Sequence, residues 1–344
     1  MENKPNTSVI LWLLCGCFLI FLMVVIGGIT RLTYSGLSMV EWHLFMGAIP
    51  PLNEQDWNAL FQKYQQFPEF KELNYAFTVN DFKTIFWWEY IHRMLGRLIG
   101  LVFIVPFFWF MLKKKLSPKL TTQLGIIFLL GAFQGFLGWF MVKSGLNKEP
   151  SVSHYRLAAH LITAFAAFGY TFWVALGLKN SEFRILNSEL KKLKKWVYVL
   201  FGILIVQIIY GAFVAGMKAG IGYNTFPKMG DEWIASNAFS LSPFWLNLFE
   251  NKTGVQFIHR CMAYLVVIFS GIAWWKSRKM ELPLSLKTGF NVLSALVLLQ
   301  FLLGVLTLLN RVPLSLALLH QLGAFLLFGT LVFLMHRLKS ATSQ

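Results

Sequence analysis

Four histidines have the residue types and spacing to bind iron from two sides. His92 and His259 each follow an isoleucine and precede an arginine, whereas His160 and His320 each lie five residues before a phenylalanine. All four fall inside long apolar stretches, where a histidine is costly and usually faces a bundle interior or a cavity. A hydrogen-bonded contact between helices is the ordinary alternative for one such residue. Two matched pairs favour haem ligation by opposing imidazoles.

Zinc is a weaker candidate for these pairs. A zinc ion needs a third and a fourth ligand from Cys, His or carboxylate, and neither half of the chain offers an obvious set. The arginines that follow the Ile-His pairs, Arg93 and Arg260, could meet the propionates of a haem. Long basic side chains that reach toward the membrane surface are an equally ordinary explanation.

A carboxylate accompanies the first of these histidines. Glu89 precedes His92 by three residues, so both side chains lie on one face of a helix, roughly 5–6 Å apart at Cβ. The equivalent position in the second half is Gln256, which does not ionise. Glu89 could exchange protons or stabilise developing positive charge beside a haem. Alternatively, it is a boundary carboxylate paired with Arg93 or Arg97.

These residues belong to an internal repeat. The segment EYIHRMLGRL (Glu89–Leu98) corresponds to QFIHRCMAYL (Gln256–Leu265), and QGFLG (Gln134–Gly138) corresponds to QFLLG (Gln300–Gly304). The glutamine follows the first histidine by 42 residues in one half and by 41 in the other. The segments around His160 and His320 match as well, and the opening helices share the spacing of Gly27 to Gly36 and of Gly211 to Gly220.

The elements that carry these side chains are transmembrane helices. The chain of 344 residues is 56% hydrophobic and 13% charged, against roughly 25% charged in a soluble domain. Apolar runs long enough to cross a bilayer of about 30 Å occur at about 9–29, 87–111, 121–142, 155–178, 196–216, 257–275, 289–309 and 314–335. We therefore predict an all-α membrane protein of eight transmembrane helices, arranged as two pseudo-symmetric four-helix bundles related by a parallel repeat.

The bundles are predicted at residues 1–180, with an outer loop at 31–86, and at residues 181–344, with an outer loop at 217–256. Of the 31 basic residues, 17 lie in the two termini and the alternate loops, against only four acidic residues there. The positive-inside rule places those segments in the cytoplasm. Because the net charge of +16 is spread over short clusters between apolar runs, it does not indicate a nucleic-acid partner. No cysteine lies in a polar loop, and His43, His154 and His336 are interpreted as surface or interfacial.

The motifs resemble those of the heme A synthase family over nearly the whole chain. The resemblance covers GGITRLTYSGLSMVEW (Gly27–Trp42), EYIHRMLGR (Glu89–Arg97), QGFLGWFMVKSGL (Gln134–Leu146), the His160 region, FIHR (Phe257–Arg260) and LLHQLGAF (Leu318–Phe325). One branch of that family has a cysteine pair in the first outer loop. This chain lacks the pair and resembles the other branch, which is found in proteobacteria and mitochondria.

The resemblance implies an enzyme that oxidises the C8 methyl of heme O to a formyl group, through two hydroxylations and loss of water. It implies that His92 and His160 flank the substrate heme O, that Glu89 is the catalytic carboxylate, and that His259 and His320 hold a permanent heme b. A multi-pass protein of the bacterial cytoplasmic membrane follows, with both termini cytoplasmic. The heme O synthase and an electron donor outside this chain are the implied partners.

Two other classes of function fit the histidine pairs. A bis-His cytochrome b would pass electrons without altering either haem. A transporter would use the histidines to relay protons. The residue that distinguishes an enzyme from the electron carrier is Glu89, and bound haem distinguishes both of them from the transporter.

Overall fold

The structure is a computed structural model that describes residues 7–40, 48–146, 150–179 and 188–342, and this part of the chain is helical and contains no β-strand. Eight of its helices are long and apolar enough to cross a membrane. The predicted all-α membrane architecture is therefore confirmed. In lipid the backbone must satisfy its own hydrogen bonds, which is why the apolar runs fold as helices.

The eight long helices extend past the predicted apolar runs at most of their ends. They are α1 (Thr7–Leu32), α4 (Val79–Leu112), α5 (Pro118–Gly145), α6 (His154–Leu178), α7 (Ser188–Gly216), α9 (Lys252–Arg278), α10 (Leu284–Leu309) and α11 (Leu314–Thr342). The largest extensions are at the starts of α4 and α7. Helix α4 starts early because Thr78 and Asp81 form a reciprocal capping box, which satisfies two backbone N–H groups at the helix start.

The chain divides into two compact units. We call Cys15–Ala164 the first unit, and the remainder, Met1–Leu14 with Phe165–Gln344, the second unit. The boundaries fall inside α1 and α6, so these helices contribute residues to both units. The end of each unit that carries its long loop (residues 33–78 in the first, 217–251 in the second) is called the loop end.

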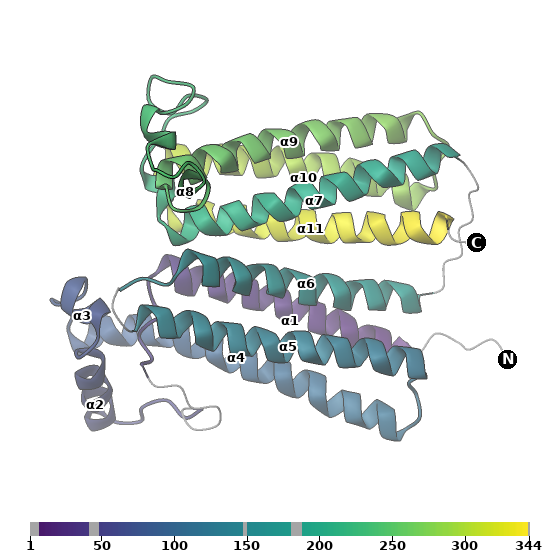
Figure 1. Cartoon of the computed structure of the whole chain (residues 1–344). Helices are drawn as coiled ribbons and strands as arrows, with labels where there is room; N and C mark the ends of the chain where they lie inside the picture. The colour runs from purple at the N-terminus through teal and green to yellow at the C-terminus, as the bar shows by residue number, and fades with distance from the viewer. Residues whose placement is uncertain (1–6, 41–47, 147–149, 180–187, 343–344) are drawn as a thin grey trace. The chain divides into compact units, whose positions relative to one another are not determined.

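The long loop of the first unit contains two short helices, α2 (Glu54–Tyr64) and α3 (Pro68–Glu72), which lie beside the start of α4 in Figure 1. Aromatic side chains hold them there. Trp57 packs edge-on against Phe86, and the ring of Tyr64 lies tilted against that of Phe82 at a centroid distance of 5.1 Å. The described aromatic residues of this loop form a buried cluster with the first turns of α4.

The second unit is a bundle in which α7 packs on α9 and α11, and α10 packs on the same two helices. Its loop contains two short 3-10 helices, η1 (Ala219–Ile221) and η2 (Ser236–Phe239), and the short helix α8 (Leu246–Phe249). The side chain of Asn251 caps α9 by accepting hydrogen bonds from the backbone N–H groups of Thr253 and Gly254. The cap fixes the point at which the loop ends and α9 begins, one helical turn before the Gln256–Arg260 segment.

Candidate functional site

In the first unit, each candidate histidine lies against a glycine of the neighbouring helix. A Cβ atom added at Gly27 of α1 would lie 2.9 Å from Cε1 of His92 on α4. One added at Gly138 of α5 would lie 3.2 Å from Cε1 of His160 on α6. His92 and His160 are also close enough to interact electrostatically. Because no side chain stands at either glycine, both imidazoles fit between helices of the same unit.

The second unit repeats this arrangement at the equivalent positions. A Cβ atom at Gly211 of α7 would lie 3.2 Å from Cε1 of His259, and one at Gly304 of α10 would lie 2.9 Å from Cε1 of His320. His259 and His320 likewise interact electrostatically. The sequence repeat that linked these histidines therefore coincides with a repeated contact between a histidine and a glycine.

The ring nitrogens show what this arrangement could bind. Among the described residues, the four Nδ1 atoms are buried and have no hydrogen-bond partner, a state that ordinarily costs about 1–3 kcal/mol for each group. The four side chains as a whole are only half-buried. Two imidazoles from two helices, in apolar surroundings, form a donor set that suits haem iron. No group of three or more metal-binding side chains occurs in the described ranges.

Glutamines approach three of these histidines. The amide Nε2 of Gln134 donates to the backbone oxygen of His160 at 3.0 Å, and that of Gln300 donates to the backbone oxygen of His320 at 2.8 Å. Gln134 also lies 3.3 Å from Nε2 of His160, and Gln207 lies 3.4 Å from Nε2 of His259. The last two contacts exceed the usual hydrogen-bond length of about 2.9–3.0 Å, so a ligand could displace them at little cost.

Glu89 is almost fully buried, with 3% of its surface exposed, and both carboxylate oxygens are hydrogen-bonded. Oε1 accepts from Nη2 of Arg93 at 2.6 Å and from its Nε at 3.1 Å. Oε2 accepts from the hydroxyl of Ser38 and from the backbone N–H of Met39, each at 2.7 Å. The ion pair with Arg93 is therefore formed, whereas Arg97 contacts the sulfur of Met94. A buried carboxylate beside a candidate iron ligand is thus held in one orientation.

The second unit keeps the arginine of this network and loses the charge. Nη2 of Arg260 donates to the backbone oxygen of Tyr223 at 2.9 Å, as Nη2 of Arg93 donates to that of Met39 at 2.7 Å. Gln256, in place of the glutamate, donates to the same Tyr223 oxygen at 3.1 Å. Gly222 is the residue equivalent to Ser38 by the spacing of the repeat. Both arginines therefore fasten a long loop to a helix, but among the described residues a carboxylate joins this network in the first unit alone.

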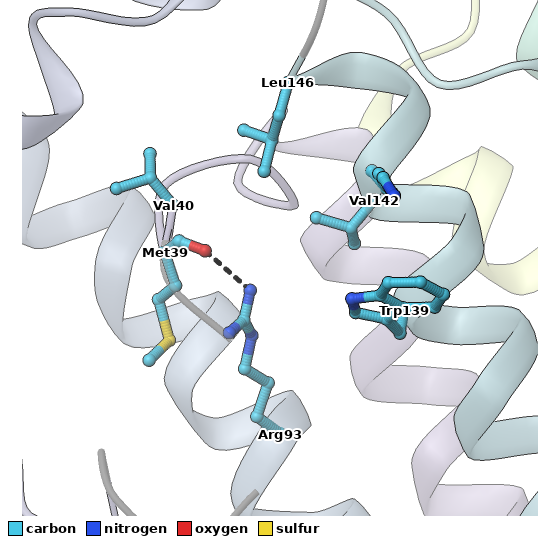
Figure 2. Close-up of a pocket in the computed structure, with 7 residues that line it drawn as sticks. Met39, Val40, Arg93, Trp139, Val142 and Leu146 are labelled. Carbon is cyan, nitrogen blue, oxygen red and sulfur yellow. Dashed lines mark hydrogen bonds between the residues drawn. The ribbon is translucent and has the colours of Figure 1, made fainter. Parts of the chain in front are cut away.

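A cavity of about 200 Å³ opens beside this network in the first unit. Its lining residues are Met39, Val40, Arg93, Trp139, Val142, Lys143 and Leu146. Figure 2 shows Arg93 and the Met39–Val40 segment facing Trp139 and Val142 across it, with the Arg93–Met39 hydrogen bond dashed. Lys143 Nζ lies 5.1 Å from the centre of the Trp139 ring. The cavity is apolar apart from these two cations.

The remaining histidines differ in part from expectation. His336 was interpreted as surface or interfacial, and this is wrong, because only 9% of it is exposed and its ring packs edge-on against Trp173. The side chain is covered by α6, where Trp173 packs on the ring and a Cβ added at Gly177 would lie 3.6 Å from its Nε2. His154 is half-buried and its ring lies 4.0 Å from that of Tyr155. His43 lies outside the described residues.

Several residues of the site could not be recognised from the sequence. The four glycines lie inside the repeated motifs, but the space that a missing side chain leaves for a histidine on another helix depends on how the helices pack. Ser38 and Lys143 lie in motifs quoted for the family resemblance, and only the folded chain places them beside Glu89 and Arg93. The one sign of their importance in the sequence is that the equivalent positions of the second half hold different residues.

Comparison with known proteins gives a consistent result over the whole chain. Residues 10–332 match the model of the COX15-CtaA family, described as cytochrome oxidase assembly protein. A protein of Flavobacterium psychrophilum named heme A synthase is 49% identical over 97% of this chain and 99% of its own length. Proteins of the same name from Flavobacterium johnsoniae and Nitrosospira multiformis are 49% and 47% identical, each over 98% of this chain, and over 99% and 94% of their own lengths.

Proposed function

The chain belongs to the COX15-CtaA family of cytochrome oxidase assembly proteins, and on this basis we propose that it is a heme A synthase, which oxidises the C8 methyl of heme O to the formyl group of heme A. Three relatives that carry this name match it over at least 97% of its length. The activity requires a haem site with an ionisable group beside the substrate. The first unit supplies a candidate for both.

We assign the substrate site to His92 and His160, and a permanent heme b to His259 and His320. The matched glycine contacts and the partnerless Nδ1 atoms support haem at both places. When bound, the permanent haem would supply one-electron transfer to and from the substrate site. Arg260, whose Nε is buried without a partner among the described residues, would hold a propionate in the second unit, and Arg93 lies at the equivalent place in the first.

The difference between Glu89 and Gln256 supports placing the reaction in the first unit. Converting a methyl to a formyl group takes up one water and releases four protons and four electrons, by way of two hydroxylations and loss of water from the geminal diol. Glu89 can accept protons beside the substrate, and its hydrogen bonds from Ser38, Met39 and Arg93 keep it in place. The amide of Gln256 does not ionise, which suits a haem that only carries electrons.

The location of the protein and its partners follow from the same proposal. The protein is embedded in a membrane by its eight apolar helices, and we propose the bacterial cytoplasmic membrane, with both termini in the cytoplasm as the distribution of basic residues indicates. Heme O would come from its synthase in the same membrane. The electrons would pass to or from a redox partner outside this chain. A nucleic-acid partner is not expected.

The decisive experiment measures which haem a cell accumulates. A host that makes heme O and lacks heme A is given the wild-type chain or the Glu89→Ala variant, and extracted haem is identified by mass. We expect heme A with the wild type and none with the variant, whereas the spectrum of the second-unit haem stays unchanged in both.

Two outcomes would favour the other functions. An unchanged yield of heme A with Glu89→Ala would remove the carboxylate from the reaction, and failure of the wild type to form heme A would leave a cytochrome b that carries electrons. Purified protein without a haem absorption band, despite sufficient haem supply, would point to a transporter. Gln256→Ala is the matched control, because it truncates the equivalent side chain in the second unit.

A further inference from the structure

The cavity beside Arg93 is too small for a whole haem and large enough for one of its side arms. Its volume is about 200 Å³, below the roughly 300–1,000 Å³ of sites that enclose a drug-sized ligand. Its walls come from the Met39–Val40 segment and α4 on one side and from the last turns of α5 on the other. It therefore suits a short substituent that projects from a larger molecule.

The charges on its lining indicate an anionic substituent. Arg93 already forms an ion pair with Glu89 at 2.6 Å and donates to the Met39 oxygen, so its positive charge is offset within the protein. Lys143 is exposed, and its ammonium group lies over the face of Trp139. Among the described lining residues, the positive charge that no carboxylate offsets is therefore that of Lys143. A carboxylate on a short aliphatic arm matches one ammonium group among apolar side chains.

The cavity also lies at the right place along the helices. Val142, in its wall, is four residues after Gly138, the glycine that contacts His160, so it lies one helical turn, about 6 Å, nearer the loop end. Arg93 directly follows His92 in the sequence. A porphyrin between His92 and His160 whose polar edge faces the loop end would thus extend a propionate toward the cavity.

The second unit has a different chemistry at these positions. By the spacing that relates Gln134 to Gln300, the residues equivalent to Trp139 and Lys143 are Val305 and Leu309. The next cation along the chain, Arg311, lies beyond the end of α10. A permanently bound haem needs to be oriented once, whereas a substrate must be oriented in every turnover. The lysine is present in the unit that we assign to the substrate.

We propose that Lys143, packed on Trp139 and next to Arg93, forms a carboxylate subsite that binds one propionate of the substrate haem and so orients it. The inference rests on the proposed function. The methyl group that becomes the formyl group shares its pyrrole ring with one propionate. Binding that propionate beside Arg93, which contacts Glu89, directs the reacting methyl to the side of the carboxylate. Lys143 is thus a positioning residue.

The test compares heme O with its propionate dimethyl ester as ligands of the full-length protein, with the second unit already loaded with haem. Dissociation constants are measured by absorbance titration at low ionic strength, because an exposed charge is screened by salt. We expect the wild type to bind the free acid about tenfold more tightly than the ester. Lys143→Met should lower this ratio roughly threefold to tenfold, and Lys143→Arg should largely retain it.

Lys83→Met is the matched control. Lys83 also lies over a tryptophan in the first unit, 5.4 Å from the ring centre of Trp57, but it does not line the cavity. It should leave the ratio unchanged. An equal ratio in wild type and Lys143→Met, or equal loss of affinity for acid and ester, would overturn the subsite. An effect of Lys143 on binding without any heme A formation would retain the subsite and reject the proposed reaction.

Discussion

Adding one methyl group at a glycine that contacts a histidine should disable one haem site and leave the other intact. Gly304→Ala would place a Cβ atom 2.9 Å from Cε1 of His320, and Gly27→Ala would place one 2.9 Å from Cε1 of His92. Carbon atoms in contact prefer about 3.5–4.0 Å, so the imidazole or its helix must move by about 0.6 Å. Metal–ligand distances are held to within about 0.2 Å.

The two variants should therefore differ in which site they damage. Gly304→Ala should lower the haem-to-protein ratio or shift the absorption bands of the second-unit haem. Gly27→Ala should reduce heme A formation and leave that haem spectrum intact. Both quantities are measured from the same cultures. The second-unit haem is followed by absorbance of the purified protein, and heme A by mass analysis of the haem extracted from the cells.

Two other glycines provide the control. Gly100 in α4 and Gly202 in α7 have open space where a Cβ would stand, and alanine is favoured over glycine in a helix interior by about 1 kcal/mol. Gly100→Ala and Gly202→Ala should thus be at least as stable as the wild type, with normal haem content. If Gly304→Ala bound haem with the same ratio and spectrum as Gly202→Ala, the assignment of His320 as an iron ligand would be refuted.

Two further predictions concern the loop end of the first unit. Ser38→Ala removes one hydrogen bond to the Glu89 carboxylate and should slow heme A formation roughly tenfold, with a changed pH profile. The control Ser270→Ala truncates a buried serine of the second unit and should not slow it. Equal rates in the two variants would contradict the role of Ser38. Burial and the neighbouring Glu69 raise the pKa of Tyr64 well above its usual value of about 10, so the neutral phenol contributes stability below that pH and the contribution is lost as the pH rises further. Protease resistance of the α2–α3 segment should accordingly fall above about pH 10 in the wild type, and an equally steep fall in Tyr64→Phe would exclude this cause.

The sequence allowed the membrane helices to be predicted because lipid leaves the backbone few alternatives. The apolar runs marked all eight helices, and the repeat singled out four of seven histidines without any coordinates. The helix ends were less predictable. Helix α4 begins at Val79, eight residues before its apolar run, because polar residues cap it. His92 consequently lies nearer the middle of the helix than the apolar run indicates.

The parts of the site that escaped prediction depend on contacts between distant segments. The hydrogen bond from Ser38 to Glu89 joins residues 51 positions apart, and no periodicity relates them. From the sequence, Glu89 could pair with Arg93 or with Arg97. The ion pair forms with Arg93, which follows Glu89 by one turn of the same helix. The described structure places the Met39 oxygen beside Arg93.

If both units hold a haem as we propose, their comparison separates what a haem site requires from what the reaction requires. The histidines, the glycines against them and the arginine that holds the loop occur in both, so we attribute them to holding a haem. Glutamate, serine and lysine at residues 89, 38 and 143 have neutral counterparts in Gln256, Gly222 and Leu309. Two of the three differences change a charge, and the third removes a hydrogen-bond donor to one of those charges. Introducing glutamate, serine and lysine at Gln256, Gly222 and Leu309 would therefore test what limits the second unit to its proposed role in electron transfer. The cause is either its scaffold or the absence of these three side chains.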